Sequence, residues 1–169
     1  CWRCHKPVIF RATSQWFCSV DDFKEDAVKA AEDVKWFPEW GKDRLQSMVK
    51  ERADWCISRQ RKWGVPIPVV YCQDCGKEII DNDVMMKVSK IFGEEGSDAW
   101  FAHDTEYFLP KGFKCPHCGS DKGFDKEKDI MDVWFDSGSS HAAVCRKRGY
   151  LKVPADVYLE GADQYSCLL

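Results

Sequence analysis

The chain has 169 residues, is 44% hydrophobic and 14% aromatic, and carries a formal net charge of −3. This apolar content excludes a disordered or collagen-like chain, and no apolar run reaches the roughly 20 residues that a membrane helix needs. The slightly acidic balance does not favour a broad nucleic-acid-binding surface, so any such contact has to be local. Because the chain opens on Cys1 within a Cys-Trp-Arg-Cys string, we expect a piece of a longer protein.

The first part of the chain is predicted to alternate extended runs with two helices. Residues 1–20 should be mostly extended, because short apolar runs alternate there with polar residues. Apolar residues at helical spacing predict a helix over 23–33, capped by one of the aspartates just before it. A proline and a glycine separate it from a second helix over 42–53, and the apolar run 55–58 predicts a buried strand.

The rest of the chain is predicted to place strands and helices around cysteine-rich turns. A strand over 69–71 leads into one cysteine pair, and helical spacing predicts a helix over 84–92. The charged run 121–129 should lie exposed, a helix is expected over 141–148, and 157–159 is predicted to be a buried closing strand. The overall class is therefore α/β with an embedded metal module.

Six of the ten cysteines occur as three Cys-x-x-Cys pairs, and two of these pairs are followed by glycine. This spacing lets both sulfurs of a tight turn face one ion, and a tetrahedral zinc needs two such turns. The glycine takes a left-handed conformation without steric cost. Four sulfurs complete the zinc shell, so the site should be structural and should exclude His117. We predict a Cys4 zinc ribbon ligated by Cys72, Cys75, Cys115 and Cys118.

Other uses of the cysteines are open at this point. A secreted disulfide scaffold is usually loop-rich, whereas this chain has eight tryptophans and ten phenylalanines for a core. A thioredoxin-like redox pair needs one Cys-x-x-Cys at a helix start and not two matched turns. The pair Cys1 and Cys4 has no matching pair, so we interpret it as a metal half-site whose mate lies upstream of this chain.

Four strings of the sequence follow the order of one known family. Trp-Cys-Ile-Ser-Arg-Gln-Arg-Lys-Trp-Gly at 55–64 resembles a signature of class I synthetases for large aliphatic amino acids. Asp-Val-Trp-Phe-Asp-Ser-Gly-Ser-Ser at 132–140 narrows the resemblance, and 156–164 resembles the strand and loop that hold an aminoacyl-adenylate. Residues 1–17 resemble the exit from an editing domain. The chain as a whole resembles the isoleucyl-tRNA synthetase family.

This resemblance implies a Rossmann-type domain that activates isoleucine with ATP and Mg²⁺ and transfers it to tRNA(Ile). A separate domain of the family hydrolyses mischarged valine, because one methylene in an apolar pocket is worth only about 1–3 kcal/mol. We therefore expect part of a Rossmann-type catalytic sheet with the zinc ribbon embedded in it. The resemblance implies four parts in chain order. Residues 1–54 return from the editing insertion, and 55–71 form a strand segment of the catalytic domain. Residues 72–128 form the zinc ribbon with a helical insertion, and 129–169 form the segment that binds the amino acid and the adenylate.

The resemblance also implies a substrate site in the last segment. Glu160 would bind the ammonium group of the adenylate, because ligands of open α/β sheets bind at the carboxyl ends of strands. Gln164 would contact the same intermediate, Trp134 would form a wall of the isoleucine pocket, and Asp136 lies beside it. Taken without the resemblance, Trp134 is more simply a core aromatic residue and Glu160 a solvated carboxylate.

A short basic and aromatic segment resembles residues near the path of the tRNA acceptor end. Arg59, Arg61 and Trp63 combine groups that bind phosphate with one that stacks on bases. An ordinary surface of ion pairs is an equally good interpretation of the two arginines.

The sequence also departs from the family. Its HIGH and KMSKS strings, which grip the ATP phosphates, are not among these residues, and Ser-Cys-Leu-Leu at 166–169 replaces its Arg-Gly-Trp-Phe. Without such groups the transition state lacks electrostatic stabilisation, so the chain alone is expected to be inactive. The alternative function is a stand-alone zinc-ribbon module that binds nucleic acid or protein. We expect a cytoplasmic, monomeric fragment without membrane contact.

Overall fold

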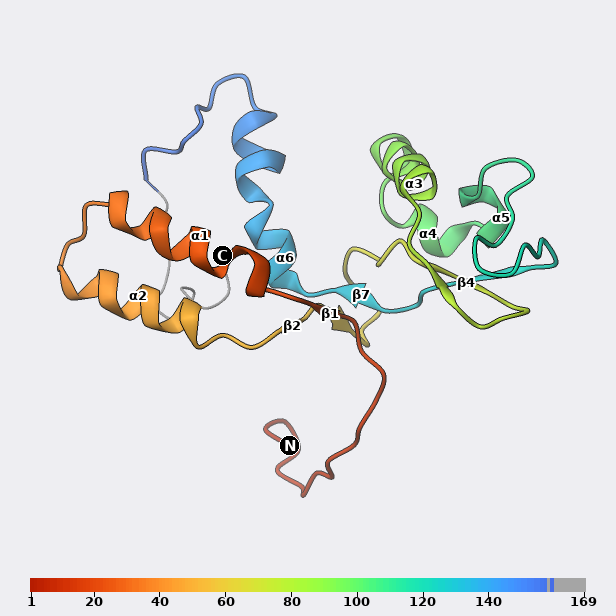
Figure 1. Cartoon of the computed structure of the whole chain (residues 1–169), viewed down its shortest axis with the longest axis horizontal. Coiled ribbons are helices and arrows are strands. Elements are labelled where there is room, and N and C mark those ends of the chain that lie inside the picture. The colour runs from red at the N-terminus through yellow and green to blue at the C-terminus, as the bar shows by residue number, and fades with distance from the viewer. Residues whose placement is uncertain (158, 160–169) are drawn as a thin grey trace.

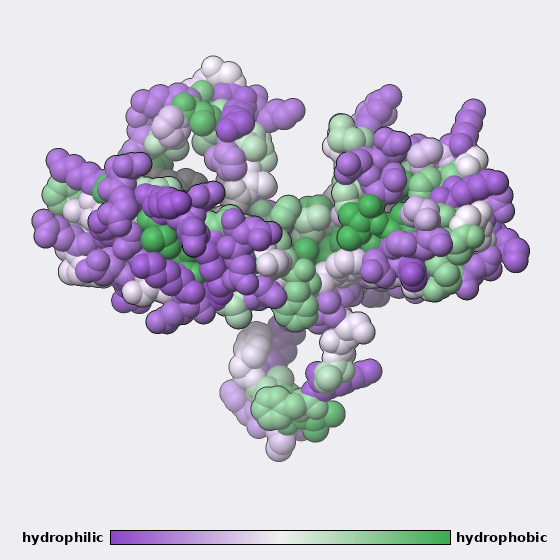
Figure 2. Space-filling model, in the orientation of Figure 1, coloured by the Kyte–Doolittle hydropathy of each residue, from purple (hydrophilic) through white to green (hydrophobic). Residues whose placement is uncertain are grey.

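The computed structural model describes residues 1–157 and residue 159, and within them two lobes flank a narrow band of short strands (Figure 1). A helical hairpin lies on one side of the band, and a lobe that carries the second and third Cys-x-x-Cys pairs lies on the other. The N-terminal stretch runs away from both lobes, and Figure 2 shows hydrophobic residues gathered on it. Ile9 and Phe10 on this stretch are almost fully exposed.

The helical hairpin consists of α1 (Asp21–Ala30), a 3₁₀ turn (Ala31–Asp33) and α2 (Trp40–Lys50). Both predicted helices are confirmed, each starting two residues early. The predicted aspartate cap is wrong, because α1 begins after Val20 and no side chain caps it. Asp21 lies inside the first turn, where its charge favours the positive end of the helix dipole. Only Val49 of α2 and Ala31 of the turn are buried apolar side chains here.

The central band is built from two antiparallel pairs. β1 (Phe17–Cys18) pairs with β2 (Trp55–Cys56), and β3 (Ser58–Arg59) pairs with β7 (Ile130–Met131). The strand predicted over 55–58 is thus broken at Ile57, whose carbonyl accepts a 2.7 Å hydrogen bond from the backbone N–H of Asp132. The chain continues from β7 into α6 (Val133–Gly138) and a π-helical turn (His141–Arg146), which covers most of the helix predicted over 141–148.

The cysteine lobe has its own sheet and core, and we use this name for residues 70–126. β4 (Val70–Cys72) lies between β5 (Glu78–Ile79) and β6 (Phe124–Lys126), and both pairings are antiparallel. The predicted helix over 84–92 is confirmed as the longer α3 (Asn82–Glu95), capped by Asp81, and is followed by α4 (Ala99–Ala102) and α5 (Thr105–Phe108). The rings of Trp100 and Phe108 lie 4.8 Å apart and are fully buried.

Two expectations about the second half are wrong. The run 121–129 is not simply exposed, because β6 forms within it and Phe124 packs into the core of the cysteine lobe. Successive side chains of a strand point to opposite faces, so Asp125 is exposed, whereas Lys126 lies on the face of Phe124 and donates to the carbonyls of Trp100 and His103. The buried strand over 157–159 is absent at its described ends, since Val157 and Leu159 are exposed. No described strand lies beside them to bond their backbone.

The structure is a mixture of helices and small sheets, as predicted, but residues 1–157 form no Rossmann sheet. Every strand pair among the described residues is antiparallel, whereas a Rossmann sheet is mostly parallel. None of the described helices combines the length and apolar character that crossing a membrane requires.

Candidate metal centre and the turn before α6

The second and third cysteine pairs form two turns of the same shape. In each turn the N–H of the trailing glycine donates to the carbonyl of the first cysteine, at 2.8 Å for Gly76 on Cys72 and for Gly119 on Cys115. Both glycines have a positive φ, 68° and 74°, which residues with a Cβ rarely adopt. The tight turn leaves the two sulfurs of each pair on one side of the backbone.

Tertiary packing brings these turns together into one cluster. The Sγ atoms of Cys72 and Cys118 are 3.7 Å apart, as are those of Cys75 and Cys115, and all four sulfurs lie within 4.8 Å of one another. A tetrahedral zinc with Zn–S bonds of about 2.3 Å separates its sulfurs by about 3.8 Å. The four predicted ligands therefore meet in the geometry of a Cys4 zinc site.

The charge of the cluster also calls for a cation. Burial raises the pKa of Cys115, but hydrogen bonds from backbone N–H groups of its own turn outweigh it and lower that pKa to about 6. At Cys118 a backbone N–H lowers the pKa. Burial and the three neighbouring sulfurs outweigh that bond, so the pKa of Cys118 is raised overall. Four thiolates this close repel one another, and a divalent cation removes that repulsion. The donor set fits zinc in both spacing and charge.

The other cysteine pair and the nearby histidine lie outside this cluster. Cys1 and Cys4 are exposed, and neither joins a metal-ligating group among the residues that the structure describes. The Nε2 atom of His117 lies 2.9 Å from the carbonyl of Glu78, so the ring faces the backbone of β5 and not the sulfurs.

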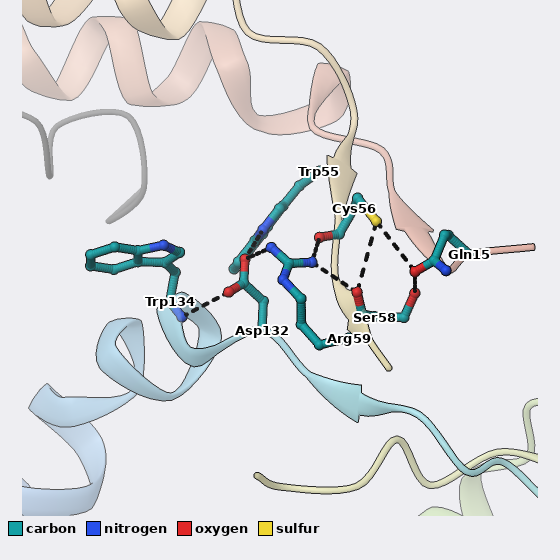
Figure 3. Close-up of polar contacts among 7 residues, drawn as sticks. All are labelled: Gln15, Trp55, Cys56, Ser58, Arg59, Asp132 and Trp134. Carbon is teal, nitrogen blue, oxygen red and sulfur yellow. Dashed lines mark hydrogen bonds and ion pairs between the residues drawn. The ribbon is translucent and has the colours of Figure 1, made fainter. Parts of the chain in front are cut away.

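A second group of polar residues surrounds Asp132, at the turn between β7 and α6 (Figure 3). Its side chain is only 4% exposed and forms an ion pair with Arg59, with Nη2 at 2.6 Å from Oδ2. The same oxygen accepts a 2.9 Å hydrogen bond from the indole N–H of Trp55, and Oδ1 accepts from the backbone N–H of Trp134. Asp132 is thus the N-cap of α6. An aspartate before an apolar run is a recognisable cap signal, although our sequence analysis assigned it no role.

The predicted substrate residues lie in and beyond this helix. Trp134 and Asp136 belong to α6 and are half-buried, and the Trp134 ring lies on the side of Asp132 opposite Arg59 (Figure 3). Burial, and then the charge of Asp132, raise the pKa of Asp136. Glu160 and Gln164 lie outside the described residues, so their predicted roles stay predictions.

The predicted nucleic-acid-binding residues separate into two kinds. Arg59 is half-buried and fixed in place, because besides Asp132 its guanidinium donates to the carbonyls of Cys56 and Ser58 at 2.7 and 2.8 Å. Arg61 and Trp63 lie in the loop after β3, and Trp63 is 94% exposed. An open pocket of about 630 Å³ lies between this loop and the start of α6. The loop therefore presents groups that are more exposed to solvent than Arg59 is.

A carboxylate that the sequence analysis placed on the surface joins the two halves of the molecule. Glu127 accepts hydrogen bonds from the indole N–H of Trp16 at 2.8 Å and from the Tyr71 hydroxyl at 2.5 Å. Its own carbonyl accepts from the indole N–H of Trp100. Burial and the bond to Glu127 raise the pKa of Tyr71 to about 12. No sequence signal marks Glu127, because it stands in a run of charged residues.

Comparison with known proteins identifies the family of the chain. Residues 4–168 match the family model of tRNA synthetases class I (I, L, M and V). The chain therefore belongs to the class I tRNA synthetase family for isoleucine, leucine, methionine and valine.

Within that class, the similar proteins are isoleucine–tRNA ligases. Those of Caldicellulosiruptor saccharolyticus and Carboxydothermus hydrogenoformans are each 61% identical to this chain, and that of Desulfitobacterium hafniense is 58% identical. Each match covers 98% of this chain but only 18% of the relative. The chain thus spans less than a fifth of the length of these relatives, and the family predicted from the motifs is confirmed.

Proposed function

We propose that this chain is a segment of an isoleucine–tRNA ligase, which activates isoleucine with ATP and Mg²⁺ and transfers it to tRNA(Ile). The observation that carries the proposal is the 61% identity over 98% of the chain to proteins of that name. The family match also extends on both sides of the cysteine lobe, which does not favour a stand-alone zinc module.

The cysteine lobe would hold one structural zinc. The support is the convergence of Cys72, Cys75, Cys115 and Cys118, whose sulfurs lie within 4.8 Å of one another. With four sulfur ligands the shell leaves no position for water, so the metal would stabilise the lobe and take no part in the reaction. A reduced, cytoplasmic setting is the one in which such thiolates persist.

The segment from β7 onward would contribute to the amino-acid and adenylate site. Trp134 would form a wall of the isoleucine pocket with Asp136 beside it, and Glu160 and Gln164 would contact the adenylate. The support is the match of this stretch to the family, together with the rigid, capped start of α6. A fixed aromatic wall limits the volume available to the substrate side chain, which is how an apolar pocket selects by size.

The loop after β3 would contact the tRNA acceptor end through Arg61 and Trp63. A cation for phosphate and an exposed ring for base stacking are the groups that single-stranded nucleic acid requires. Arg59 would support this loop from behind through its ion pair with Asp132.

The organisation proposed for the whole follows the family. Residues 55–71 and 129–169 would belong to the Rossmann-type catalytic domain, with 72–128 inserted as the zinc ribbon and 1–54 returning from the editing domain. Groups that bind the ATP phosphates, the HIGH and KMSKS strings, are not among these residues. The chain by itself would therefore be inactive, and we expect it to be monomeric.

Isoleucine-dependent exchange between ATP and pyrophosphate tests the proposal. The full-length protein should catalyse exchange with isoleucine, and valine should be poorer by about 10–200-fold in kcat/KM, the discrimination that one methylene allows. The chain of residues 1–169 should show no exchange. Preference for another amino acid would overturn the proposed substrate, and exchange by the chain alone would overturn its inactivity.

A further inference from the structure

We infer that the ion pair between Asp132 and Arg59 is a positioning device that sets the Trp134 ring for isoleucine binding. This inference rests on the proposed function, because it takes Trp134 as a wall of the isoleucine pocket. It assigns to Asp132 and Arg59 a role in substrate affinity, although neither residue would touch the substrate.

The start of α6 is held through both the backbone and the side chain of Asp132. The backbone N–H donates to the carbonyl of Ile57 at 2.7 Å, at the bend between β2 and β3. The side chain accepts from the N–H of Trp134, which places that residue in the first turn of the helix. A cap of this kind is worth about 1 kcal/mol. The position of the Trp134 backbone therefore follows the position of the Asp132 carboxylate.

The carboxylate is in turn fixed from the opposite side. Arg59 binds it with Nη2, and Nη1 of the same guanidinium donates to the carbonyls of Cys56 and Ser58. A planar guanidinium with several donors holds such a geometry, whereas the point charge of a lysine does not. The indole of Trp55 adds a third fixed contact to the carboxylate, and its ring lies 6.2 Å from that of Phe135 in α6.

The anchoring extends to the segment that precedes the band. Ser58 is only 1% exposed, and its hydroxyl donates to Oε1 of Gln15 at 2.7 Å (Figure 3). The same hydroxyl accepts from the backbone N–H of Trp16 at 2.8 Å. Arg59 is therefore attached to a strand that is itself locked in place. A selective pocket requires a surrounding shell of this kind, because the shell holds the side chains of the pocket within a fraction of an ångström.

The test measures isoleucine and ATP affinity in the full-length protein by the exchange assay. Asp132→Ala should raise the KM for isoleucine about tenfold, because a small displacement of a pocket wall is costly. The KM for ATP should change by less than about twofold, since only one substrate meets the wall. Asp132→Asn can keep its one oxygen as the acceptor for the Trp134 N–H, but it then turns an NH2 group, which cannot accept, toward Arg59 and Trp55. Because the cap is kept and the ion pair is lost, its effect should be intermediate. This variant carries the test if Asp132→Ala does not fold.

Asp81→Ala is the matched control, because Asp81 caps α3 in the cysteine lobe through a 3.0 Å hydrogen bond from Val84 N–H. It removes the same kind of cap far along the chain from α6, so it should lower stability and leave the KM for isoleucine unchanged. A rise in that KM with Asp81→Ala equal to the rise with Asp132→Ala would overturn the inference, because the effect would then be one of general stability.

Trp134→Ala separates this inference from the proposed function. If it raises the KM for isoleucine while Asp132→Ala does not, the positioning role is overturned and the pocket role stands. If neither variant raises it, the pocket role fails and takes the inference with it. In the Trp134→Ala background, Asp132→Ala should add less than about twofold, because the two changes act through one ring. A full additional tenfold there would show that Asp132 does not act through Trp134.

Discussion

The cysteine lobe and the helical hairpin are built on different principles although each contains amphipathic helices. In the lobe, Trp100 and Phe108 have no exposed surface, and a cluster of sulfurs lies at the edge of the same core. In the hairpin, α1 has no buried residue, while Phe37 and Trp40 are 80% and 60% exposed. The lobe therefore encloses its own core, and the hairpin leaves large apolar side chains outside.

The four-cysteine cluster would let a bound metal add stability to a small unit. Below about 70–80 residues a hydrophobic core alone rarely gives more than a few kcal/mol, and a structural metal commonly supplies the remainder. The cysteine lobe is of that size and has the ligands for such a metal. The hairpin has no such cluster among its described residues, and its helices contact chiefly each other.

Removing the metal should have the largest effect on the difference between the cysteine lobe and the helical hairpin. Cys72→Ser, or a strong chelator, should unfold the lobe, because zinc binding in small modules contributes about 10–16 kcal/mol of apparent free energy. Hydrogen exchange should show loss of amide protection over 70–126 and little change in α1 and α2. Metal analysis should find about one zinc per chain before the change and none after it.

The matched control for that experiment is Cys145→Ser, since Cys145 is a half-buried thiol outside the cluster. It should keep the zinc and the protection of the lobe. A lobe that stays protected in Cys72→Ser, or a protein that never contains zinc, would contradict the metal site.

Truncating one tryptophan in each region should show how much the stability of the lobe and of the hairpin depends on a large aromatic side chain. Trp100→Ala should destabilise the lobe by about 3–5 kcal/mol, because it leaves a cavity beside Phe108 and removes the indole bond to Glu127. Trp40→Ala in the hairpin should change stability by no more than about 0.5 kcal/mol, as expected for a mostly exposed side chain. Urea unfolding of the two variants measures the difference. Equal losses would mean that Trp40 is buried against a neighbour.

The smallest expected effect is pH-dependent and concerns the link between the lobe and the band. Burial raises the pKa of Glu127, but hydrogen bonds from Tyr71, Trp16 and two backbone N–H groups lower it below 4.5 overall. A carboxyl whose pKa is lowered by folding contributes stability above its unfolded pKa and loses it as pH falls through the folded value.

Thermal unfolding from pH 7 down to pH 3 should therefore show a loss that is smaller in Glu127→Gln. At pH 7 this variant should be less stable by about 1–3 kcal/mol, since the half-buried donors Trp16 and Tyr71 lose a charged acceptor. The exposed Glu25 of α1 provides the control, because Glu25→Gln should follow the wild type at every pH. If Glu127→Gln and the wild type lost the same stability as the pH falls, Glu127 would not be the group responsible for the pH dependence.

Local features of the chain were predicted well. Helical spacing located α1, α2 and α3, and two Cys-x-x-Cys-Gly strings identified four ligands that the fold does bring together. These signals are local, because a helix face and a tight turn are specified by residues a few positions apart. Features with distant partners were missed. Glu127 stands in a charged run, and its contact with Trp16 joins residues 111 positions apart.

By itself, the sequence determined the family, the cysteines that the fold brings together and most of the helices, since motif spacing and periodicity are written along the chain. Only the tertiary structure decided which charges are buried. It buried the carboxylate of Asp132 and paired it with Arg59, it left Trp63 in solvent, and it broke the strand at Ile57, whose carbonyl binds the backbone N–H that precedes α6. Burial of a charge depends on whether packing supplies a partner, and that partner can lie 73 residues away, as Asp132 does from Arg59.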